Sequence, residues 1–469
     1  MQPTIPGFLQ DAAKLFSGNG APLYLVGGWP RNRLLGLPPG DLDVSSALPP
    51  EVAAELFEQV PGVRVIERST RLGTFGVFYA GEQAEYTAFR TESYGEGGAH
   101  RPEQVCFGAT MEQDALRRDF TVNAIYHDIS SSRDIDPLGG LTDIAARQLR
   151  TCRKPAETFA DDGLRLMRLA RFAAELDFTI EEETYATAQE NAVLLADIVP
   201  ERLQAELFKI LLADMKYQAL NYAQSPVLKG LHLLDELGLL PLLLPELEPC
   251  RGVAQRADYH DHDVLEHLFR AASCAPPELS LRLAGLLHDV GKPHALEKNG
   301  KMVGHDKLGE PIAREILTRL RCSNALIDEV TALVRWHMAD LDGKTGEKRL
   351  RLFFVKLGRE RSRKLAELRR ADVWGSKETP ELGDPAGRWI ALLDKMEGEQ
   401  VPWEERNLDV DGNELAHLTG GPSPLVGYLK AELHRHTVLR PKDNNRARLM
   451  RLAKALMNDR QRLERRQTK

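Results

Sequence analysis

The segment spanning residues 25–44 constrains the fold of this 469-residue chain more than any other. Its residue order predicts a strand, a turn at Gly27-Gly28, a short helix, a second turn and another strand. Asp41 and Asp43 are two residues apart on the second strand, so we expect their side chains on the same face. Two neighbouring carboxylates repel each other unless a cation lies between them, and such hard oxygen ligands suit Mg²⁺. The glycines allow backbone N–H groups to approach a phosphate at the helix start.

This segment resembles the active-site motif of the nucleotidyltransferase superfamily. Arg31 and the Leu-Leu-Gly at 34–36 narrow the resemblance to the class II branch, which contains tRNA nucleotidyltransferases and bacterial poly(A) polymerases. The resemblance implies transfer from a nucleoside triphosphate, with two Mg²⁺ ions held by Asp41 and Asp43. One ion would activate the primer 3′-OH, and the other would stabilise the triphosphate and the departing pyrophosphate. For Asp-x-Asp alone, the alternative is a polar turn before an ordinary strand.

A second motif occupies residues 117–124 and begins with two arginines and an aspartate. It resembles the Arg-Arg-Asp-Phe-Thr-x-Asn-Ala motif of the same family, whereas a surface ion-pair cluster is the alternative. By resemblance, Arg118 would contact the triphosphate together with the Gly27-Gly28 turn. Asp119, Thr121 and Asn123 would order the site and its ribose end.

Three further parts of this region extend the resemblance. Glu85, on a predicted strand, matches the strand that can supply a third carboxylate, although a half-exposed strand glutamate is the alternative. The loop at 93–104 resembles the mobile loop of these enzymes but differs from it in length and in amino-acid sequence. Gly139-Gly140 resembles the family's hinge into the helical neck.

Arginines at helical spacing follow an aspartate further along the chain. Arg165, Arg168 and Arg171 recur every three residues, and Asp162 precedes the first of them by one turn, so we expect these groups on one helix face. An amphipathic helix with ion pairs is one interpretation. The other is base recognition, because a carboxylate can accept from the amine of cytosine or adenine while a guanidinium donates to the ring nitrogen. Uracil and guanine invert that pattern and would leave both groups unpaired.

This segment resembles the nucleotide-selecting motif of the class II family, which maps onto Asp161, Asp162 and Arg165. The family usually has Glu-Asp-Pro where this chain has Asp161 and Gly163, so the shorter first carboxylate is expected to support Arg165 less firmly. By resemblance, Arg168 and Arg171 belong to the same nucleotide-binding set. The run at 201–211 resembles the closing motif of the neck.

Histidine and aspartate residues recur between 260 and 372 in an order that is not random. The pattern resembles the HD phosphohydrolase domain, which implies a divalent metal. Imidazole with carboxylate suits Mn²⁺, Fe²⁺ or Ni²⁺ better than Mg²⁺. A helical scaffold without turnover is the alternative to a phosphatase or phosphodiesterase. The implied ligands are His267, His288, Asp289 and Asp372, with His305 and His337 as outer support or ligands of a second ion.

The length of the chain exceeds what one hydrophobic core usually serves, which predicts several domains. Strand-like runs end near residue 150 and helical periodicity continues almost to the end, so the fold class is α+β, a mixed-sheet head followed by helices. We expect a nucleotidyltransferase head over 1–150 and a helical neck for nucleotide selection and RNA binding over 151–255. An HD domain over 256–375 and a helical tRNA-binding tail over 376–469 would follow, with a linker near 376–385.

Composition restricts the cellular setting and the partners. Five scattered cysteines favour a reducing compartment, and no charged start followed by an apolar run is present, so we expect a cytoplasmic protein without a signal peptide. The most apolar stretch, 230–247, contains acidic residues and prolines, which argues against a membrane span. Net charge is −7, but residues 440–469 carry eleven Lys/Arg against three Asp/Glu. That segment is either a solvated helix face or a surface for RNA phosphates.

The resemblance therefore implies a template-independent tRNA nucleotidyltransferase that adds CMP and AMP from CTP and ATP to the tRNA 3′ end. Relatives that add only A, only CC or a poly(A) tail share the fold and remain alternatives. A rival of another class is an HD phosphohydrolase with a decayed head, which Trp29-Pro30 and Arg31-Asn32 support, because the family usually has Arg-Asp at the second pair. An RNA chaperone acting through the basic tail is a third alternative. The loss of the carboxylate at Asn32 is expected to weaken the anchoring of Arg31. The sequence gives no signal for an oligomeric state.

Overall fold

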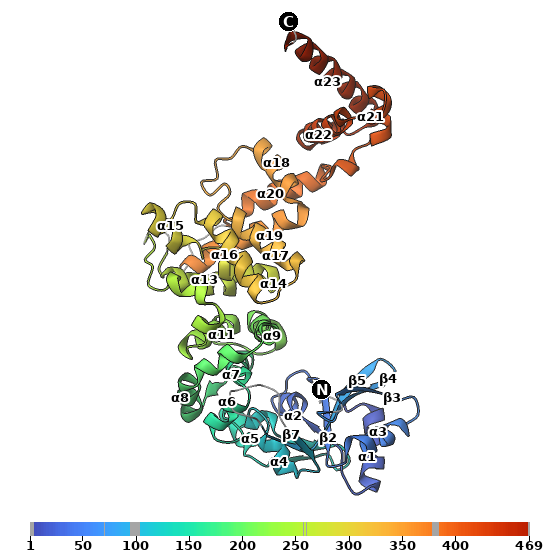
Figure 1. Ribbon diagram of the computed structural model, residues 1–469, viewed down its shortest axis with the longest axis vertical. Coiled ribbons are helices and arrows are strands. Elements are labelled where there is room, and N and C mark those ends of the chain that lie inside the picture. The colour runs from blue at the N-terminus through green and yellow to red at the C-terminus, as the bar shows by residue number, and fades with distance from the viewer. Residues whose placement is uncertain are drawn as a thin grey trace. The chain divides into compact units, whose positions relative to one another are not determined.

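The computed structural model describes residues 4–69, 71–93, 104–256, 258, 260–377 and 384–467. Two compact units make up the chain (Figure 1). One unit contains Met1–Arg251 and Glu315–Ser323, and the other contains Gly252–Arg314 and Asn324–Lys469. Among the described residues, no helix combines the length and the apolar character that a membrane crossing requires.

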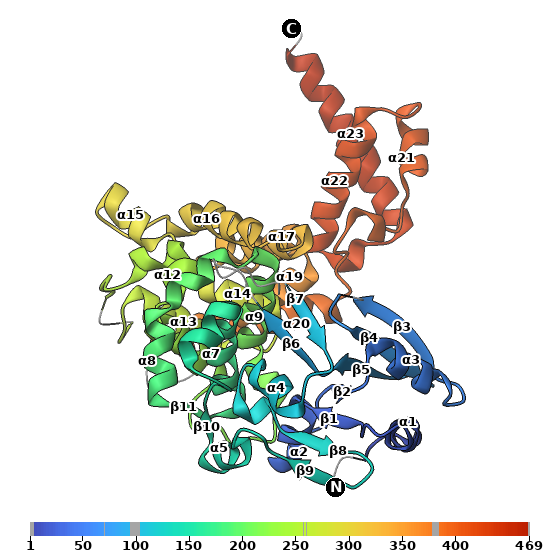
Figure 2. The ribbon, with the colours of Figure 1, turned by 60° about the horizontal axis from the view of Figure 1, so that its bottom comes forward.

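A seven-stranded mixed sheet forms the head of the first unit, in the order β3-β4-β5-β2-β1-β8-β9 (Figure 2). The β2–β5 pair is parallel, and the other neighbouring pairs are antiparallel. The two strands predicted within residues 25–44 are β1 and β2, and the predicted strand that carries Glu85 is β5. The strands are β1 (Tyr24–Val26), β2 (Leu42–Ser46), β3 (Arg64–Ser69), β4 (Thr74–Tyr79), β5 (Glu82–Ala88), β8 (Tyr126–Asp128) and β9 (Arg133–Ile135).

Helices α1 (Gly7–Gly18) and α3 (Pro50–Glu58) supply apolar side chains to the core of the head. Phe16 of α1 and Phe57 of α3 meet with ring centroids 5.1 Å apart, and both rings lie near Tyr86 of β5. This core fixes one face of the strands that carry the carboxylates. The remaining elements of the head are α2 (Gly28–Leu34), β6 (Arg90–Ser93), β7 (Gln104–Phe107), α4 (Met111–Leu116) and η1 (Thr121–Asn123).

The neck is helical, as predicted, apart from one short parallel pair of strands, β10 (Gln148–Leu149) with β11 (Thr179–Ile180). Two residues per strand are too few to produce a periodic signal in the sequence. Helix α7 packs against α9 and α11. The neck elements are α5 (Gly140–Ala146), α6 (Pro155–Asp161), α7 (Leu164–Leu176), α8 (Glu182–Glu190), η2 (Ala192–Asp197), α9 (Pro200–Leu211), α10 (Ala213–Lys216), α11 (Pro226–Glu236), α12 (Leu240–Leu243) and η3 (Pro245–Cys250).

The second unit begins with helices α13 to α19, whose close crossings depend on glycine. A Cβ at Gly285 of α14 would lie 2.8 Å from the Cα of Ala272, and one at Gly375 of α19 would lie 2.6 Å from the backbone nitrogen of Ala271. Glycine therefore lets α14 and α19 approach α13. These helices are α13 (Val264–Cys274), α14 (Leu279–Leu287), α15 (Lys292–Asn299), α16 (His305–Arg319), α17 (Asn324–Trp336), α18 (Glu347–Leu357) and α19 (Arg359–Ser376).

The last part of the chain has its own apolar core, made by Leu415, Leu429, Leu433 and Leu449 with their neighbours. Residues 446–467 of the basic segment at 440–469 form α23. Most of the predicted loop at 93–104, and residues 378–383 of the predicted linker, lie outside the described residues. The elements are α20 (Gly387–Gly398), η4 (Glu405–Asn407), α21 (Gly412–Thr419), α22 (Pro424–Leu439), η5 (Pro441–Asp443) and α23 (Arg446–Gln467).

Candidate active site and metal centre

Three carboxylates gather where β2 begins. Asp43 of β2 is in register with Val26 of β1 and with Glu85 of β5, and Asp41 is exposed just before the strand. Gly27 has a φ of +79°, and a Cβ there would lie 3.3 Å from Oδ2 of Asp43. Glycine therefore permits both the left-handed turn and its close approach to the carboxylate. We name Asp41, Asp43 and Glu85 the carboxylate edge.

A cavity of about 400 Å³ opens beside this edge. Asp43 and Glu85 line it together with Arg90, Arg117 and Arg118. Carboxylates suited to a cation and guanidinium groups suited to a phosphate therefore border the same space. Such a pairing can hold a metal ion and a phosphate chain side by side.

The pKa of Asp43 reflects its crowded surroundings. Burial raises this pKa from 3.8 to about 6; Arg118 opposes the shift, while the negative charges of Glu85 and Asp41 add to it. A bound divalent cation would favour the ionised form that these groups disfavour. The carboxylate edge thus fits a metal ion on chemical grounds.

Asp114 of α4 is a functional candidate that the sequence interpretation missed. Its carboxylate is fully buried and accepts from Arg117 at 2.7 Å, Arg118 at 2.9 Å and the Tyr126 hydroxyl at 2.6 Å. Burial raises the pKa of Asp114, but the two arginines outweigh it and bring the pKa to about 2. An aspartate three and four residues before two arginines was the available signal, because that spacing places them on one helix face.

The second sequence motif forms a buried chain of hydrogen bonds. Asn123 donates to Oδ1 of Asp119 at 3.0 Å, and Arg168 donates to Oδ2 of Asp119 at 2.8 Å. Burial raises the pKa of Asp119, but Arg168 and Asn123 outweigh that effect and hold this pKa well below its usual range. Arg31 donates to the Asn123 amide oxygen at 2.5 Å. The motif at 117–124 is therefore joined to α2 on one side and to α7 on the other.

The structure corrects one expectation about Arg31. The lost carboxylate at position 32 was expected to weaken the anchoring of Arg31, yet the amide oxygen of Asn32 accepts two of its N–H groups. Asparagine and aspartate share shape and an accepting oxygen, so the geometry of the pair survives.

The expected single helix face for Asp162 and Arg165 is wrong. Helix α6 ends at Asp161 and α7 begins at Leu164, so Asp162 lies in the break, with an extended φ of −155°. Its carboxylate forms a bidentate ion pair with the guanidinium of Arg202 in α9, with N–O distances of 2.7 and 3.2 Å. Helical spacing does not apply across a break, which is why the prediction failed.

Arg165 is held by backbone oxygens and by one carboxylate. It donates to the carbonyl oxygens of Thr158 at 3.0 Å and Arg117 at 2.6 Å, and Asp161 lies 3.6 Å from its guanidinium. The shorter carboxylate at position 161 therefore still reaches Arg165. The departure at Gly163 also has a steric reason, since a Cβ there would lie 2.5 Å from the backbone oxygen of Leu194.

Arg171 forms ion pairs with two carboxylates of the neck. It pairs with Glu206 at 2.6 Å and with Glu175 at 2.9 Å, and its guanidinium lies 4.0 Å from the centroid of the Phe172 ring. Both carboxylates are buried. These contacts hold α7 to α9, and a contact of Arg171 with a nucleotide stays a prediction.

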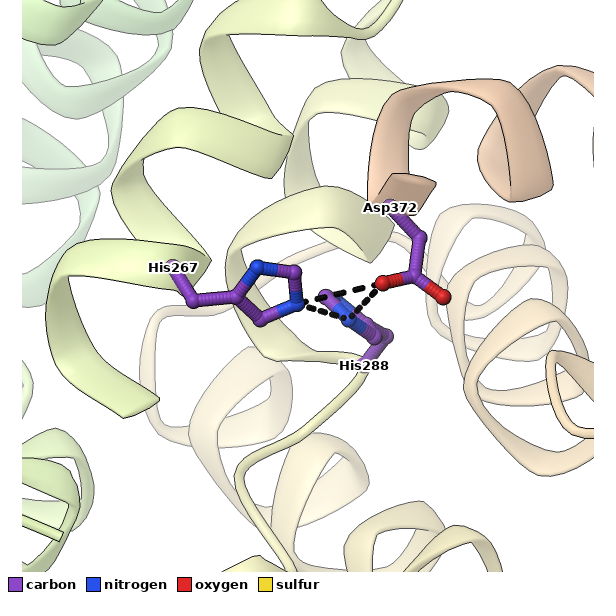
Figure 3. A group of neighbouring side chains, drawn as sticks. All are labelled: His267, His288 and Asp372. Atoms are coloured by element: carbon purple, nitrogen blue, oxygen red, sulfur yellow. Dashed lines mark hydrogen bonds and ion pairs between the residues drawn. The ribbon is translucent and has the colours of Figure 1, made fainter. Parts of the chain in front are cut away.

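In the second unit, all six residues of the predicted metal site lie together. His267 of α13, His288 after α14 and Asp372 of α19 point toward one another (Figure 3). Asp289 forms a second group with His305 and His337. The Nε2 atoms of His267 and His288 are 3.1 Å apart, and those of His305 and His337 are 3.0 Å apart. We name these six residues the histidine–aspartate cluster.

The hydrogen bonds of the histidine Nδ1 atoms determine the protonation of the Nε2 atoms that face the centre of the cluster. Nδ1 of His288 lies 2.9 Å from the oxygen of Gly285, that of His305 lies 2.7 Å from the oxygen of Met302, and that of His337 lies 2.7 Å from the oxygen of Val334. A carbonyl oxygen accepts only, so each neutral ring carries its proton on Nδ1 and points an Nε2 lone pair inward. Facing lone pairs repel unless a proton or a metal cation lies between them.

Asp289 joins the two groups of ligands. Its Oδ2 lies 3.2 Å from Nε2 of His288, and its Oδ1 lies 2.9 Å from Nε2 of His305. Burial lowers the pKa of His288, but Asp289 and Asp372 outweigh this effect and raise it to about 10. The field that attracts a proton attracts a divalent cation as well, so the six residues of this donor set would suit divalent cations.

Three family models match parts of this chain. Residues 23–150 match the poly(A) polymerase head domain, 177–251 match the probable RNA- and SrmB-binding site of polymerase A, and 248–374 match the HD domain. A CCA-adding enzyme of Geobacillus thermodenitrificans is 32% identical over 407 residues, which cover 86% of this chain and 85% of that enzyme. The chain therefore belongs to the tRNA nucleotidyltransferase and poly(A) polymerase family, and it is a nucleotidyltransferase with a fused HD domain.

Two further relatives refine this assignment. An A-adding tRNA nucleotidyltransferase of Deinococcus radiodurans is 35% identical over 341 residues, covering 68% of this chain and 73% of that protein. The crystal structure of the Bacillus stearothermophilus CCA-adding enzyme in complex with CTP superposes with a TM-score of 0.68 at 25% identity, over 97% of this chain and 100% of that one. The expected fold, an α+β head followed by helical regions, is confirmed.

Proposed function

We propose that this chain adds CMP and AMP, from CTP and ATP, to the 3′ end of tRNA without a template. One observation carries the proposal: the Gly27 turn touches Asp43, Glu85 is in register beside it, and arginines border the same cavity. That arrangement places groups for a metal ion, a phosphate chain and an attacking hydroxyl within one space. The names of the two relatives and the CTP complex described above support tRNA and these nucleotides as substrates.

In this proposal, Asp41 and Asp43 hold two Mg²⁺ ions, and Glu85 is the third carboxylate. Divalent ions bound there would supply charge stabilisation for the attacking and leaving oxygens. The Gly27-Gly28 turn and Arg118 bind the phosphates. Asp114 accepts from Arg118 and orients its guanidinium.

Asp162 and Arg165 select the base. Arg165 is anchored through the carbonyl oxygen of Arg117, so the selecting guanidinium is tied to the motif that borders the phosphates. Asp162 accepts from Arg202, and its carboxylate would accept from an exocyclic amine. Arg168 fixes Asp119. Selection and transfer therefore share one connected set of side chains.

The histidine–aspartate cluster supports a second activity, metal-dependent hydrolysis of phosphate esters. Its converging Nε2 lone pairs and the carboxylate of Asp289 would suit Mn²⁺, Fe²⁺ or Ni²⁺. His267, His288 and Asp372 would hold one ion, and Asp289, His305 and His337 the other. Two adjacent ions of this kind can bind a phosphate and activate a water.

We also propose the four-part division at 150, 255 and 375, with the helical tail, whose residues 440–469 are rich in Lys and Arg, binding the tRNA body. A reducing, cytoplasmic setting is consistent with the cysteines, none of which forms a disulfide among the described residues. Members of the two matched families use divalent metals, and the nucleotide and tRNA partners follow from the proposed reaction.

The decisive experiment removes one carboxylate. We expect Asp41→Ala to abolish incorporation of CMP and AMP into tRNA that lacks its 3′ end, by at least about a thousandfold, because the metal loses a ligand. Asp11→Ala, which removes an exposed aspartate of α1, is the matched control. Primers ending before CCA, after C and after CC distinguish full addition from A-only, CC-only and poly(A) addition. Full activity of Asp41→Ala would overturn the assignment.

A further inference from the structure

A loop just before α13 contacts the histidine–aspartate cluster without supplying any of its six residues. We name residues 252–263 the strap, of which residues 257 and 259 lie outside the described part of the chain. The carboxylate of Asp263 at one end of the strap accepts from the backbone N–H of Gly252 at the other end, at 2.6 Å. The strap is therefore a closed loop at the start of α13.

Two further contacts fix the middle of the strap. The amide oxygen of Gln255 accepts from the ammonium group of Lys292, which also contacts the Asp289 carboxylate of the cluster. The backbone N–H of Asp261 donates to the carbonyl oxygen of Ser376 at 3.0 Å. The strap is thus joined to the first residue of α15 and to the last residue of α19.

These contacts bring His260 of the strap to the cluster. Its half-buried ring packs edge-to-face on the ring of His267, with the centroids 4.7 Å apart. Nδ1 of His260 is buried and has no hydrogen-bond partner among the described residues. A buried ring nitrogen without a partner costs free energy, so its place beside the cluster indicates a partner that arrives with the substrate.

The histidines of the cluster differ from His260 in this respect. Nδ1 of His288, His305 and His337 each lies within 2.9 Å of a backbone oxygen. Their Nε2 atoms face other members of the cluster. Among the described residues, His260 belongs to neither group of ligands that could hold a metal ion. It is therefore a hydrogen-bonding group next to the metal ligands that metal binding does not use.

The exposure of the ligands shows where a substrate reaches the cluster. The side chains of His267, His288 and Asp289 are at most 3% exposed, whereas that of Asp372 is 20% exposed. Ser376, which accepts from the strap, lies one helical turn after Asp372 and donates through its hydroxyl to the backbone oxygen of Asp372 at 2.8 Å. The strap therefore lies beside the exposed ligand of the cluster.

We propose that His260 is a substrate-binding residue of this second site, and that its Nδ1 donates to an oxygen of the phosphate that the cluster hydrolyses. A phosphate held by divalent ions presents several acceptor oxygens. An imidazole can carry a proton on Nδ1 whether it is neutral or charged, so the donor requires no change of charge. This inference rests on the proposed hydrolysis of phosphate esters and deepens it. Gln255 and Asp261 act as positioning residues, because they hold the strap in place.

The test is His260→Phe in the full chain loaded with Mn²⁺. Phenylalanine keeps an aromatic ring against His267 and removes the donor. We expect the dissociation constant of inorganic phosphate to rise by about tenfold, because a hydrogen bond to a charged acceptor is lost. The amount of bound Mn²⁺ and its dissociation constant should stay within about threefold of the parent protein. Calorimetric titration measures both constants, and thermal unfolding checks that the variant is folded.

Two matched variants separate the hydrogen bond from the packing of the ring. His260→Asn keeps an N–H donor close to the position of Nδ1, and its affinity for phosphate should stay within about threefold of the parent protein. His294→Phe removes an exposed imidazole of α15 and should leave phosphate affinity unchanged. Unchanged phosphate affinity in His260→Phe would overturn the proposal, as would equal losses in His260→Asn and His260→Phe. A loss of Mn²⁺ affinity in His260→Phe as large as the loss of phosphate affinity would do the same, because the ring would then be a metal ligand.

The outcome is distinguishable from a failure of the proposed hydrolysis. If the Mn²⁺-loaded parent protein hydrolyses a phosphate ester but His260→Phe binds phosphate like the parent, hydrolysis stands and the role of His260 fails. If the parent protein hydrolyses no phosphate ester, yet binds phosphate in a manner that depends on His260, the reverse holds. A parent protein that binds Mn²⁺ but no phosphate overturns the inference, and one that binds no divalent metal overturns both.

Discussion

The carboxylate edge and the histidine–aspartate cluster are both acidic sites in one chain, but they are built in opposite ways. Asp41 is exposed, Asp43 and Glu85 are half-buried, and a cavity of about 400 Å³ opens beside them. In the cluster, His267, His288 and Asp289 are buried, and their ligand atoms lie 3.1 to 3.3 Å apart. The first site leaves room for a substrate beside its ligands, whereas the second directs its ligands at one another.

This difference indicates how each site would use a metal. Carboxylate oxygens that face an open cavity suit Mg²⁺, which keeps waters and shares its coordination with substrate phosphates. Converging imidazoles and carboxylates in a buried pocket suit a transition metal that stays with the protein. The transferase site would therefore acquire its ions with the nucleotide, and the cluster would hold its ions throughout.

The largest effect, a loss of bound metal and of phosphodiesterase activity, is expected from removing ligands of the histidine–aspartate cluster. The double variant His288→Ala with Asp289→Ala should lose bound Mn²⁺ or Ni²⁺ and at least about a thousandfold of any phosphodiesterase activity, because it removes a ligand from each group. Nucleotide incorporation should stay within about threefold of the parent protein. Metal analysis of the purified protein, hydrolysis of a chromogenic phosphodiester and primer extension report the three quantities. Loss of incorporation in this variant would show that the two sites are not independent.

A smaller effect is expected at the base-selecting side chain. Asp162→Ala should reduce the preference for CTP and ATP over UTP and GTP by about ten- to a hundredfold while some transfer remains, because an acceptor for the amine is lost. Primer extension with each nucleotide separately measures the preference. Arg202→Ala, which removes the partner of Asp162 but keeps its carboxylate, is the control and should retain most of the preference. An unchanged preference in Asp162→Ala would contradict its role in selection.

The smallest effect concerns the free energy of unfolding, which is lower when the carboxylate of Asp43 is ionised. The folded-state pKa of Asp43 is about 6, above the ordinary 3.8, so this group favours the folded state below pH 4 and loses that contribution as pH rises through about 6. Asp43→Asn should therefore be more stable than the parent protein by about 3 kcal/mol at pH 8 without metal, and the difference should vanish below pH 4. Denaturant unfolding across this pH range measures it. A difference that does not vary with pH would show that the carboxylate is not electrostatically strained.

The sequence predicted the parts whose chemistry depends on local spacing. Gly27-Gly28 before Asp41 and Asp43 predicted the turn and the strand, because a left-handed turn and a strand face are properties of neighbouring residues. The histidines and aspartates of the cluster were all identified, since their order along the helices resembles a known domain. The fold class followed from the change in periodicity near residue 150.

Contacts between distant segments were decided only by the tertiary structure. Asp162 lies in a helix break and pairs with Arg202, 40 residues away, which no helical spacing could indicate. Tyr217 reaches Arg31 across 186 positions of sequence, and Tyr126 of β8 donates to the buried carboxylate of Asp114 in α4. The sequence by itself thus determined which chemical groups are present and how each strand or helix presents them. The tertiary structure decided which charges are paired, because pairing and burial depend on the packing of segments that the sequence keeps apart.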